Sequence, residues 1–362
     1  MLGSFSTGER RALRILMVIV VISRLALAFR PQWQLYTRPY NDDAFYIFSV
    51  SYHLAHGHGL SVDGVHPTNG IQPLVTVLYT PVFMIAGDDK VLAIRLTFIL
   101  NALFDILSIL FLANLIRVLT RNSTEEKNIW LRPPILGAVG WTALYAIIVQ
   151  TNNGLETGLY SMLLLAVMYL YAKLQLKAQS SRLLEWIGFG SLLGVTVLAR
   201  IDAVFLVGCI TVIEVIRFRS EGIRRAFIIG ISSVAVSSVW WIYNYMLFGS
   251  IMPQSGMAES LKNVLVENIT RASAVLSYIG GLFFFLPGYS VPAWIPYAWI
   301  AILLSTIIVV TRRLHLINNL RTNYQLAPLL PFAFFGVCLI IYYVFFFSAP
   351  HFLPRYFQPI RI

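Results

Sequence analysis

Long apolar stretches separated by short polar ones dominate the pattern of this sequence. A helix needs about 17 to 25 mostly apolar residues to cross the hydrocarbon core of a bilayer. The stretches that approach or exceed this length are 15–29, 91–117, 133–149, 157–175, 183–199, 203–216, 225–247, 294–311 and 328–347. Two shorter pieces, 71–86 and 273–287, are undecided. The pattern predicts an all-α fold, a polytopic transmembrane helical bundle with roughly 9 to 11 membrane segments.

Positive charge predicts how this bundle is oriented. Lys and Arg gather between the predicted spans, in the loops 117–132, 173–182, 217–225 and 312–321, and they also precede the first span at Arg10, Arg11 and Arg14. Loops on the cytoplasmic side carry an excess of these residues. We therefore expect a multi-pass protein of the cell (plasma or inner) membrane, with a cytoplasmic N-terminus and an extracytoplasmic first loop.

The count of crossings limits what the segment 71–86 can do. The first loop and the segment 150–156 are both expected outside, so an even number of crossings must separate them, yet three apolar pieces lie between. The piece 71–86 is short and contains Pro73 and Pro81. We expect it to be re-entrant or to lie along the outer interface, covered by protein. This places the polar segments 42–69, 152–156, 200–202, 249–262 and 351–355 on one outer face.

Composition agrees with a membrane protein. Of the 362 residues, 58% are hydrophobic and only 12% are charged, half the charged fraction of a typical soluble domain. The net charge of +11 is attributed to the cytoplasmic loops, because no basic face with interleaved aromatics suggests nucleic-acid binding. Cys209 and Cys338 lie inside apolar runs, which argues against a disulfide framework. We expect a single transmembrane domain over 1–362, in a form that is truncated at its C-terminus or compact, with 30–70 as an extracytoplasmic catalytic loop.

An acidic pair lies in the first loop, just beyond the first predicted span. Asp42 and Asp43 open an amphipathic stretch, 44–54, that is typical of a juxtamembrane helix. An aspartate at a helix start can act as a cap and interact favourably with the helix dipole. One carboxylate suffices for that, so the second needs another partner. The alternative roles are a general base for a hydroxyl nucleophile and a metal-binding carboxylate.

The same loop contains histidines and a turn. His53, His56 and His58 have the spacing H-x-x-H-x-H, and His66 follows. Zinc binding is one interpretation, but no cysteine is present, and a solvated interfacial loop is the favoured one. The run 68–73 reads as a turn, in which Asn69 could also contact a sugar.

Other polar residues on the expected outer face have two interpretations each. Glu156 could cap the helix 157–175, or hold a metal or a sugar hydroxyl beside Asp42. Arg200 could pair with Asp202, or it could bind the phosphate of a donor. Lys262 and Arg355 could also bind that phosphate, or they could anchor the protein to lipid headgroups. Asp105 and Glu214, inside predicted spans, are expected to make interhelical polar contacts rather than to act in catalysis.

Several short motifs together resemble one superfamily. They are the Asp42-Asp43 pair after the first span, the segment Asn69-Gly70-Ile71-Gln72-Pro73-Leu74, the segment Asn153-Gly154-Leu155-Glu156-Thr157, and Pro354-Arg355-Tyr356. Their order and expected sidedness resemble the GT-C superfamily of membrane glycosyltransferases, which includes protein O-mannosyltransferases, the aminoarabinose transferase of lipid A and mycobacterial arabinofuranosyltransferases. The resemblance covers most of the chain. Many relatives have Asp-Glu where this chain has Asp-Asp, which leaves open which aspartate acts.

The resemblance implies a transferase that moves a sugar from a polyprenyl-phosphate donor to an extracytoplasmic acceptor: a glycan, a lipid or a protein. Asp42 or Asp43 would be the base, and Arg200, Arg355 or Lys262 would bind the donor phosphate. Asn69, Glu156, Asp202, His66 and Tyr356 are the expected substrate contacts. No cofactor is firmly implied, although a divalent cation could bind at Asp43 and Glu156. A transporter or flippase of lipid-linked sugars is the alternative. Such proteins are typically built from internal repeats, and we find none in this sequence. A non-catalytic membrane scaffold would explain the composition but not the one-sided polar residues.

Overall fold

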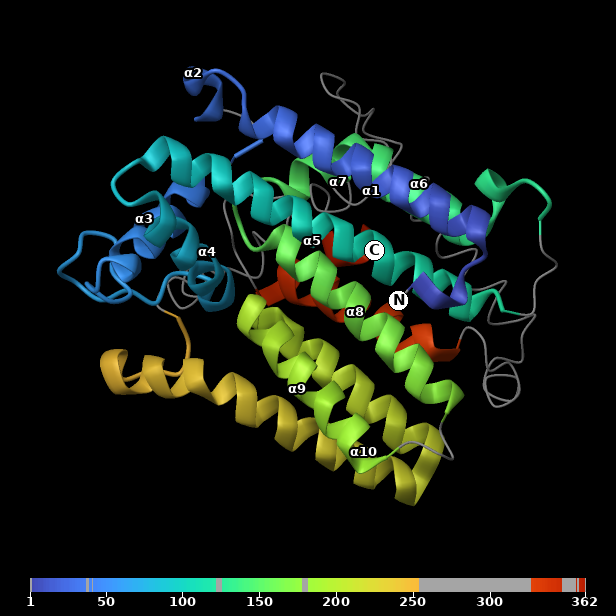
Figure 1. Ribbon diagram of the computed structural model, residues 1–362. Coiled ribbons are helices and arrows are strands. Elements are labelled where there is room, and N and C mark those ends of the chain that lie inside the picture. The colour runs from blue at the N-terminus through green and yellow to red at the C-terminus, as the bar shows by residue number, and fades with distance from the viewer. Residues whose placement is uncertain are drawn as a thin grey trace. The chain divides into compact units, whose positions relative to one another are not determined.

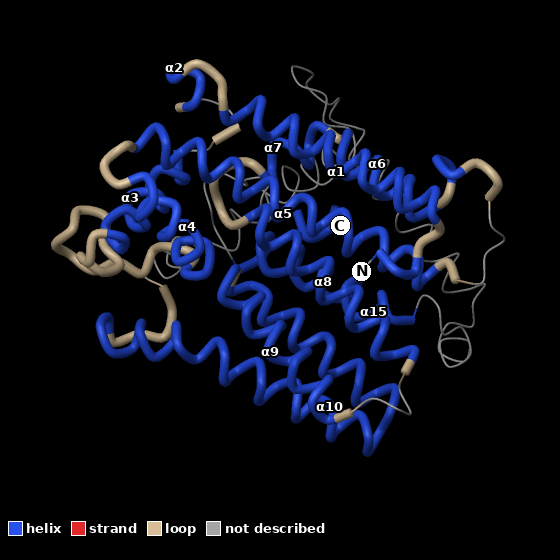
Figure 2. Tube along the Cα trace, in the orientation of Figure 1, coloured by secondary structure: helices blue, strands red, loops and turns tan. Residues whose placement is uncertain are grey.

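The computed structural model describes residues 2–36, 39–40, 42–121, 126–177, 182–253, 327–346, 356 and 358–361. Figure 1 shows helices throughout these residues, and Figure 2 shows loops between them. Within the described ranges no strand forms, and the pairing of extended backbone is confined to an isolated antiparallel bridge between Ser61 and Pro67. The prediction of an all-α fold is confirmed to this extent.

The chain divides into two compact units. The first comprises 1–204 and 227–254, and the second comprises 205–226 and 255–362. Helices of the first unit are α1 (Thr7–Ala28), α2 (Gln32–Leu35), α3 (Asp42–Ala55), α4 (Pro73–Ala86), α5 (Lys90–Leu119), α6 (Pro133–Ala143), α7 (Tyr145–Thr151), α8 (Thr157–Leu176), α9 (Leu183–Ala199) and the later part of α10 (Val204–Phe248). Short 3₁₀ turns occur at Leu2–Ser4, Ile129–Leu131 and Ile201–Ala203.

Two of these helices, α5 and α8, are long and apolar enough to cross a membrane. The helices α4 and α9, and the segment Ala327–Ile341 of the second unit, are apolar but shorter. The helix α4 has 14 residues and Pro81 in its interior. At 1.5 Å per residue it is about 21 Å long, less than the thickness of a typical hydrocarbon core. Its length agrees with the expectation that 71–86 does not cross by itself.

The segment 133–149 differs from its prediction as one uninterrupted span. It forms two helices, α6 and α7, because the backbone at Leu144 is extended (φ −70°, ψ 114°). The break lets both pieces reach the same carboxylate on α5. Trp141 of α6 donates from Nε1 to Asp105 at 3.4 Å, and Thr151 of α7 donates from Oγ1 at 3.2 Å.

Charged side chains hold the N-terminal end of α1 to the predicted cytoplasmic loop 117–132. Ser6 and Glu9 form a capping box at the start of α1, with the Ser6 N–H donating to Glu9 at 2.9 Å. The buried Glu9 carboxylate also pairs with Arg117 and, at 3.5 Å, with Arg132. Burial opposes ionisation of Glu9, but the Ser6 hydrogen bonds and the two arginines outweigh it and lower its pKa. The N-terminal ends of α1 and α6 and the C-terminal end of α5 therefore meet at one end of the first unit.

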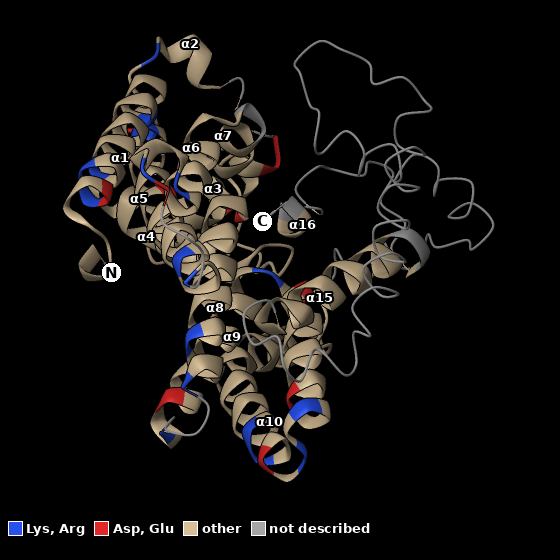
Figure 3. Ribbon diagram, turned by 90° about the vertical axis from the view of Figure 1, so that its right-hand side faces the viewer, with Lys and Arg blue, Asp and Glu red and all other residues tan. Residues whose placement is uncertain are grey.

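The helix α10 bends at Arg219, whose φ is 50° and ψ is −119°. This residue lies in the basic gap predicted between 203–216 and 225–247, and Figure 3 shows coloured charged residues at the bend of α10. Across the bend, Glu214 pairs with Arg225 at 3.6 Å. Glu214 and Arg225 lie in the two helical parts on either side of the bend. The prediction that Glu214 makes a polar contact between helices is therefore confirmed.

The second unit also contains a 3₁₀ turn, Ala327–Leu329, then α15 (Leu330–Ile341), a π-helical turn, Tyr342–Phe346, and α16 (Gln358–Arg361). The sulfur atoms of Cys209 and Cys338 lie 3.9 Å apart and both thiols are free, in agreement with the prediction of no disulfide framework. The apolar segments 273–287 and 294–311 lie outside the described residues.

Candidate functional site

The acidic pair of the first loop stands at the beginning of α3. Both Asp42 and Asp43 are exposed, and Asp42 Oδ1 accepts a hydrogen bond from the Asp43 N–H at 3.0 Å. Acidic groups in a first turn interact favourably with the helix dipole. Both aspartates therefore lie in the first turn of α3, where the helix dipole favours them, and both are exposed.

Tyr40 fixes the position of that helix start on α5. Its hydroxyl donates to the Ile94 carbonyl at 3.1 Å and lies 2.6 Å from Thr97 Oγ1, while its ring stacks on Phe98 with centroids 4.5 Å apart. Burial raises the pKa of Tyr40 well above its ordinary value, so the phenol stays protonated and keeps donating. Tyr40, two residues before Asp42, is thus anchored on α5.

A tight loop, 152–156, begins α8 directly beside the start of α3. Asn153 closes it, accepting from the Leu155 N–H at 3.0 Å and donating to Thr157 Oγ1 at 3.1 Å. Gly154 has a φ of +78°, and a Cβ atom there would lie 2.6 Å from Ala44 Cβ and 2.7 Å from Tyr40 Cδ1. Only glycine permits both the left-handed backbone and this close approach. The predicted neighbourhood of the acidic pair and the Asn153–Thr157 motif is therefore present.

Substituting Gly154 tests this contact. Gly154→Ala is expected to lower the free energy of unfolding by about 2 kcal/mol or more, because it adds left-handed strain and a clash with α3. Thermal unfolding in detergent would measure the loss. The matched control is Gly140→Ala in α6, where a Cβ meets nothing within 4 Å and φ is not positive; it should be neutral or slightly stabilising. Equal effects of the two substitutions would contradict the contact.

The side chain of Glu156 belongs to a buried ionic cluster. It accepts from Arg200 Nη1 at 3.1 Å, and Asp202 accepts from Arg200 Nη2 at 2.7 Å. These three side chains are each about 4% exposed. Tyr160 of α8 completes the cluster, since its hydroxyl donates to Asp202 at 3.2 Å and its ring centroid lies 5.3 Å from the Arg200 guanidinium.

This cluster revises two expectations. Glu156 stands at the N-cap position of α8, yet its side chain makes no capping hydrogen bond and turns to Arg200 instead. The pairing of Arg200 with Asp202 is confirmed. The guanidinium is committed to two carboxylates, so it does not offer the open bidentate grip on a phosphate that we expected.

The turn containing Asn69 packs close to the end of α9. Ile71 forms a buried cluster with Val50 of α3 and Trp240 of α10, and Leu198 of α9 packs against it. Tyr243 donates to the carbonyl of Thr68 at 3.3 Å. Asn69 itself is buried. The turn is therefore held between α3 and α10, beside the residues that lead to Arg200.

His66 has a different environment from the one expected of a substrate contact. Its side chain is 81% exposed and pairs through Nδ1 with Asp63 at 2.7 Å. Asp63 also accepts from the backbone N–H groups of Val65 and His66. Hydrogen bonds from the His66 ring first, and then from these amides, hold the pKa of Asp63 well below its usual range. His66 thus stabilises its own loop.

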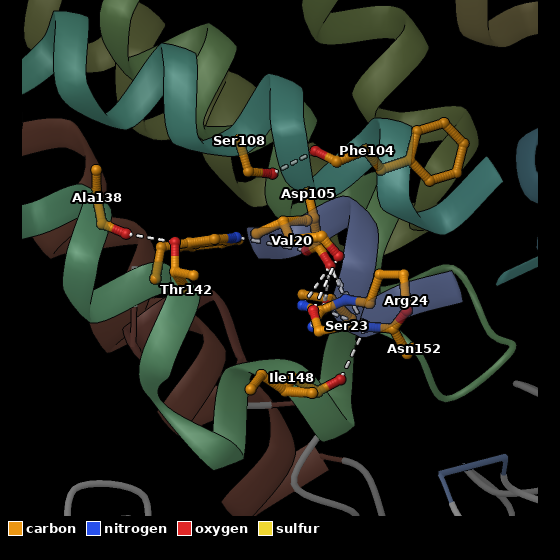
Figure 4. Close-up of polar contacts among 12 residues, drawn as sticks. Val20, Ser23, Arg24, Phe104, Asp105, Ser108, Ala138, Thr142, Ile148 and Asn152 are labelled. Atoms are coloured by element: carbon orange, nitrogen blue, oxygen red, sulfur yellow. Dashed lines mark hydrogen bonds and ion pairs between the residues drawn. The ribbon is translucent and has the colours of Figure 1, made fainter. Parts of the chain in front are cut away.

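Another buried ion pair joins helices of the first unit, and one of its members, Arg24, was not among the residues singled out from the sequence. Arg24 of α1 donates to Asp105 Oδ2 from Nε at 2.8 Å and from Nη2 at 2.7 Å, and both side chains are essentially inaccessible. Figure 4 shows Asn152 beside them, and its Nδ2 donates to Asp105 at 3.3 Å. The predicted structural role of Asp105 is confirmed. The signal for Arg24 was present, because an arginine inside an apolar span needs a buried partner.

The remaining predicted residues belong to the second unit or lie outside the described residues. Tyr356 belongs to the second unit, where its ring stacks on Tyr343 with centroids 4.8 Å apart. Lys262 and Arg355 lie outside the described residues. Within the described part of the chain, no group of three or more His, Cys, Asp or Glu side chains is placed to hold a metal ion. Cation binding by Asp43 and Glu156 stays a prediction.

Comparison with known proteins adds no family. No family model matches this sequence, and no curated protein or solved structure gives a significant match. The function is therefore argued from the site itself.

Proposed function

We propose that this protein is an integral-membrane glycosyltransferase, which moves a sugar from a polyprenyl-phosphate donor to an extracytoplasmic acceptor. One observation carries the proposal. The start of α3, with its two exposed carboxylates, touches Gly154 of the loop that supplies Glu156, and Glu156 binds Arg200. Three segments far apart in the sequence thus bring acidic and basic groups to one end of the first unit.

The proposed reaction is a single displacement at the anomeric carbon. Asp42 or Asp43 takes the proton from an acceptor hydroxyl, which then attacks that carbon as the bond to the donor phosphate breaks. Inversion is expected, because a phosphate leaving group makes a covalent intermediate unnecessary. Both carboxylates are exposed, so an acceptor can reach them. The growing negative charge on the phosphate needs a cation.

Lys262 and Arg355 are the proposed partners of that phosphate. Arg200 donates to both Glu156 and Asp202, so it could bind the phosphate only by releasing one of these two carboxylates. Its proposed role is therefore chiefly to hold these two carboxylates in place beside the sugar. Asn69 is kept as a proposed substrate contact.

The membrane setting is also a proposal. It is supported by the two helices that are long and apolar enough to cross, and by the shorter apolar helices beside them. The cluster of Glu9, Arg117 and Arg132 is proposed to face the cytoplasm, and the acidic pair the opposite side. We propose a multi-pass bundle of GT-C type in the plasma or inner membrane.

A transporter or flippase of lipid-linked sugars is the second candidate. The buried pair of Arg24 and Asp105 favours it, because ionisable groups inside membrane helices often mark transport pathways. However, Asp105 already accepts from Arg24, Trp141, Thr151 and Asn152. Such a saturated carboxylate is more typical of a structural contact.

Purified protein in liposomes distinguishes the two candidates. A panel of radiolabelled polyprenyl-phosphate sugars is supplied with lipid, glycan and peptide acceptors. The transferase proposal expects release of polyprenyl phosphate and label on an acceptor. Movement of intact donor between leaflets, without its consumption, would support the flippase instead.

A further inference from the structure

Two histidine side chains of the outer loop point their ring nitrogens at each other. His53 is the third-last residue of α3, and His58 lies in the glycine-rich turn that follows. Their Nδ1 atoms are 3.3 Å apart, and the His58 N–H donates to the His53 carbonyl at 2.9 Å. We propose that these two Nδ1 atoms bind a zinc ion between them.

The separation of the two nitrogens carries the proposal. A zinc–nitrogen bond is about 2.0–2.1 Å long, so two ligands of a tetrahedral ion lie about 3.3–3.4 Å apart. A direct hydrogen bond from a nitrogen donor is usually about 2.7–3.2 Å long. The observed 3.3 Å matches the separation of two zinc ligands, and it is also the length of a long hydrogen bond between the two rings. Imidazole nitrogens are also ligands that zinc prefers.

Solvent reaches the pair from the His58 side. His58 is exposed and His53 is half-buried. Gly64, at φ +80°, approaches both rings closely, and a Cβ there would lie 3.0 Å from His53 Nδ1 and 3.7 Å from His58 Nδ1. The neighbouring Asp63 carboxylate is bound to His66 and to backbone amides, so it is not a third ligand in this arrangement. Two protein ligands leave two positions of the ion for water, which describes an exchangeable site.

The other nearby histidine has other partners. His56 Nδ1 contacts the Tyr52 carbonyl at 2.8 Å, and its Nε2 lies 3.9 Å from Asp88. His56 therefore shares the sequence motif but not the pair, which makes it a matched control.

The zinc site is distinct from the proposed catalytic carboxylates. Asp42 and His53 are 11 positions apart on α3, about 16 Å along the helix axis. An ion at His53 and His58 would tie the end of α3 to the turn that leads into the 61–66 loop. The inference does not rest on the proposed function, and its test needs no activity.

Calorimetric titration of the purified full chain with ZnCl₂ tests the proposal. One ion per chain is expected, together with a rise in Tm on adding zinc. His53→Ala and His58→Ala should each weaken binding at least 10-fold and remove the rise in Tm. His56→Ala should leave both unchanged. Because His58 is exposed, His58→Ala is expected to keep its zinc-free Tm, so that lost binding cannot be attributed to unfolding.

Three results would overturn the assignment. The first is no saturable binding to the wild-type chain, which would leave a long hydrogen bond between the rings as the explanation. The second is equal binding by wild type and the His53→Ala, His58→Ala double variant, which would mean adventitious sites only. The third is an equal loss in His56→Ala.

Discussion

Replacing Asp42 with Asn is expected to lower the kcat of sugar transfer by about 10²- to 10⁴-fold with little change in Tm. A general base contributes an acceleration of this size, and an amide of the same shape cannot accept the proton. The amide oxygen can still accept from the Asp43 N–H, so the start of α3 is preserved. The lost helix-dipole interaction costs about 1 kcal/mol at most at an exposed position. Initial rates with a saturating lipid-linked donor measure the effect.

Asp43→Asn is the companion variant, and comparing the two identifies the base. The larger fall in kcat marks the residue that removes the proton. Asp88→Asn is a suitable control, because Asp88 is an exposed carboxylate whose partner is Tyr52 rather than the start of α3. Near-normal turnover in both Asp42→Asn and Asp43→Asn would refute the assignment of the base.

Asp105→Ala is expected to destabilise the first unit by about 3–5 kcal/mol. The substitution leaves the Arg24 guanidinium buried without its carboxylate, and breaking a buried pair by removing one partner carries a penalty of this size. It also removes the acceptor for Trp141, Thr151 and Asn152, and hence the contact that joins α6 and α7 to α5. Thermal or denaturant unfolding in detergent measures the change.

The double variant Arg24→Met, Asp105→Leu isolates the cause. Replacing both charges with apolar side chains of similar size removes the uncompensated cation, so most of the stability should return. A double variant as unstable as Asp105→Ala would show that the hydrogen bonds to α6 and α7, rather than the ion pair, dominate. A loss below 1 kcal/mol in Asp105→Ala itself would contradict the structural role.

Much of the helical framework could be predicted from the sequence. The segment 183–199 matches α9, and 157–175 matches α8 to within a residue. The basic gap between 203–216 and 225–247 coincides with the bend at Arg219. These features follow from the length of apolar runs and from charges at their ends, which local sequence reports directly. Apolar runs of this length are much longer than a typical strand, so they favour a helix.

The partners of individual side chains could not be predicted in the same way. Arg24 and Asp105 are 81 positions apart, and each sequence neighbourhood shows only that a polar group is buried. No proline or glycine stands at position 144 to predict the break between α6 and α7. The break is explained by Asp105, which accepts hydrogen bonds from Trp141 before it and from Thr151 after it. Similarly, the capping role expected of Glu156 was wrong because a long-range cation, Arg200, binds its side chain. Such contacts depend on how the helices pack, which the periodicity of apolar residues along the sequence does not reveal.

A density map of the protein with a polyprenyl-phosphate sugar bound would show directly where the donor binds. We expect the sugar to lie between the start of α3 and the 152–156 loop. The anomeric carbon should then be close enough to Asp42 or Asp43 for an acceptor hydroxyl to fit between them, at hydrogen-bond distance from the carboxylate. A sugar bound beside Arg24 and Asp105, or at the end of the unit that contains Glu9, would contradict it.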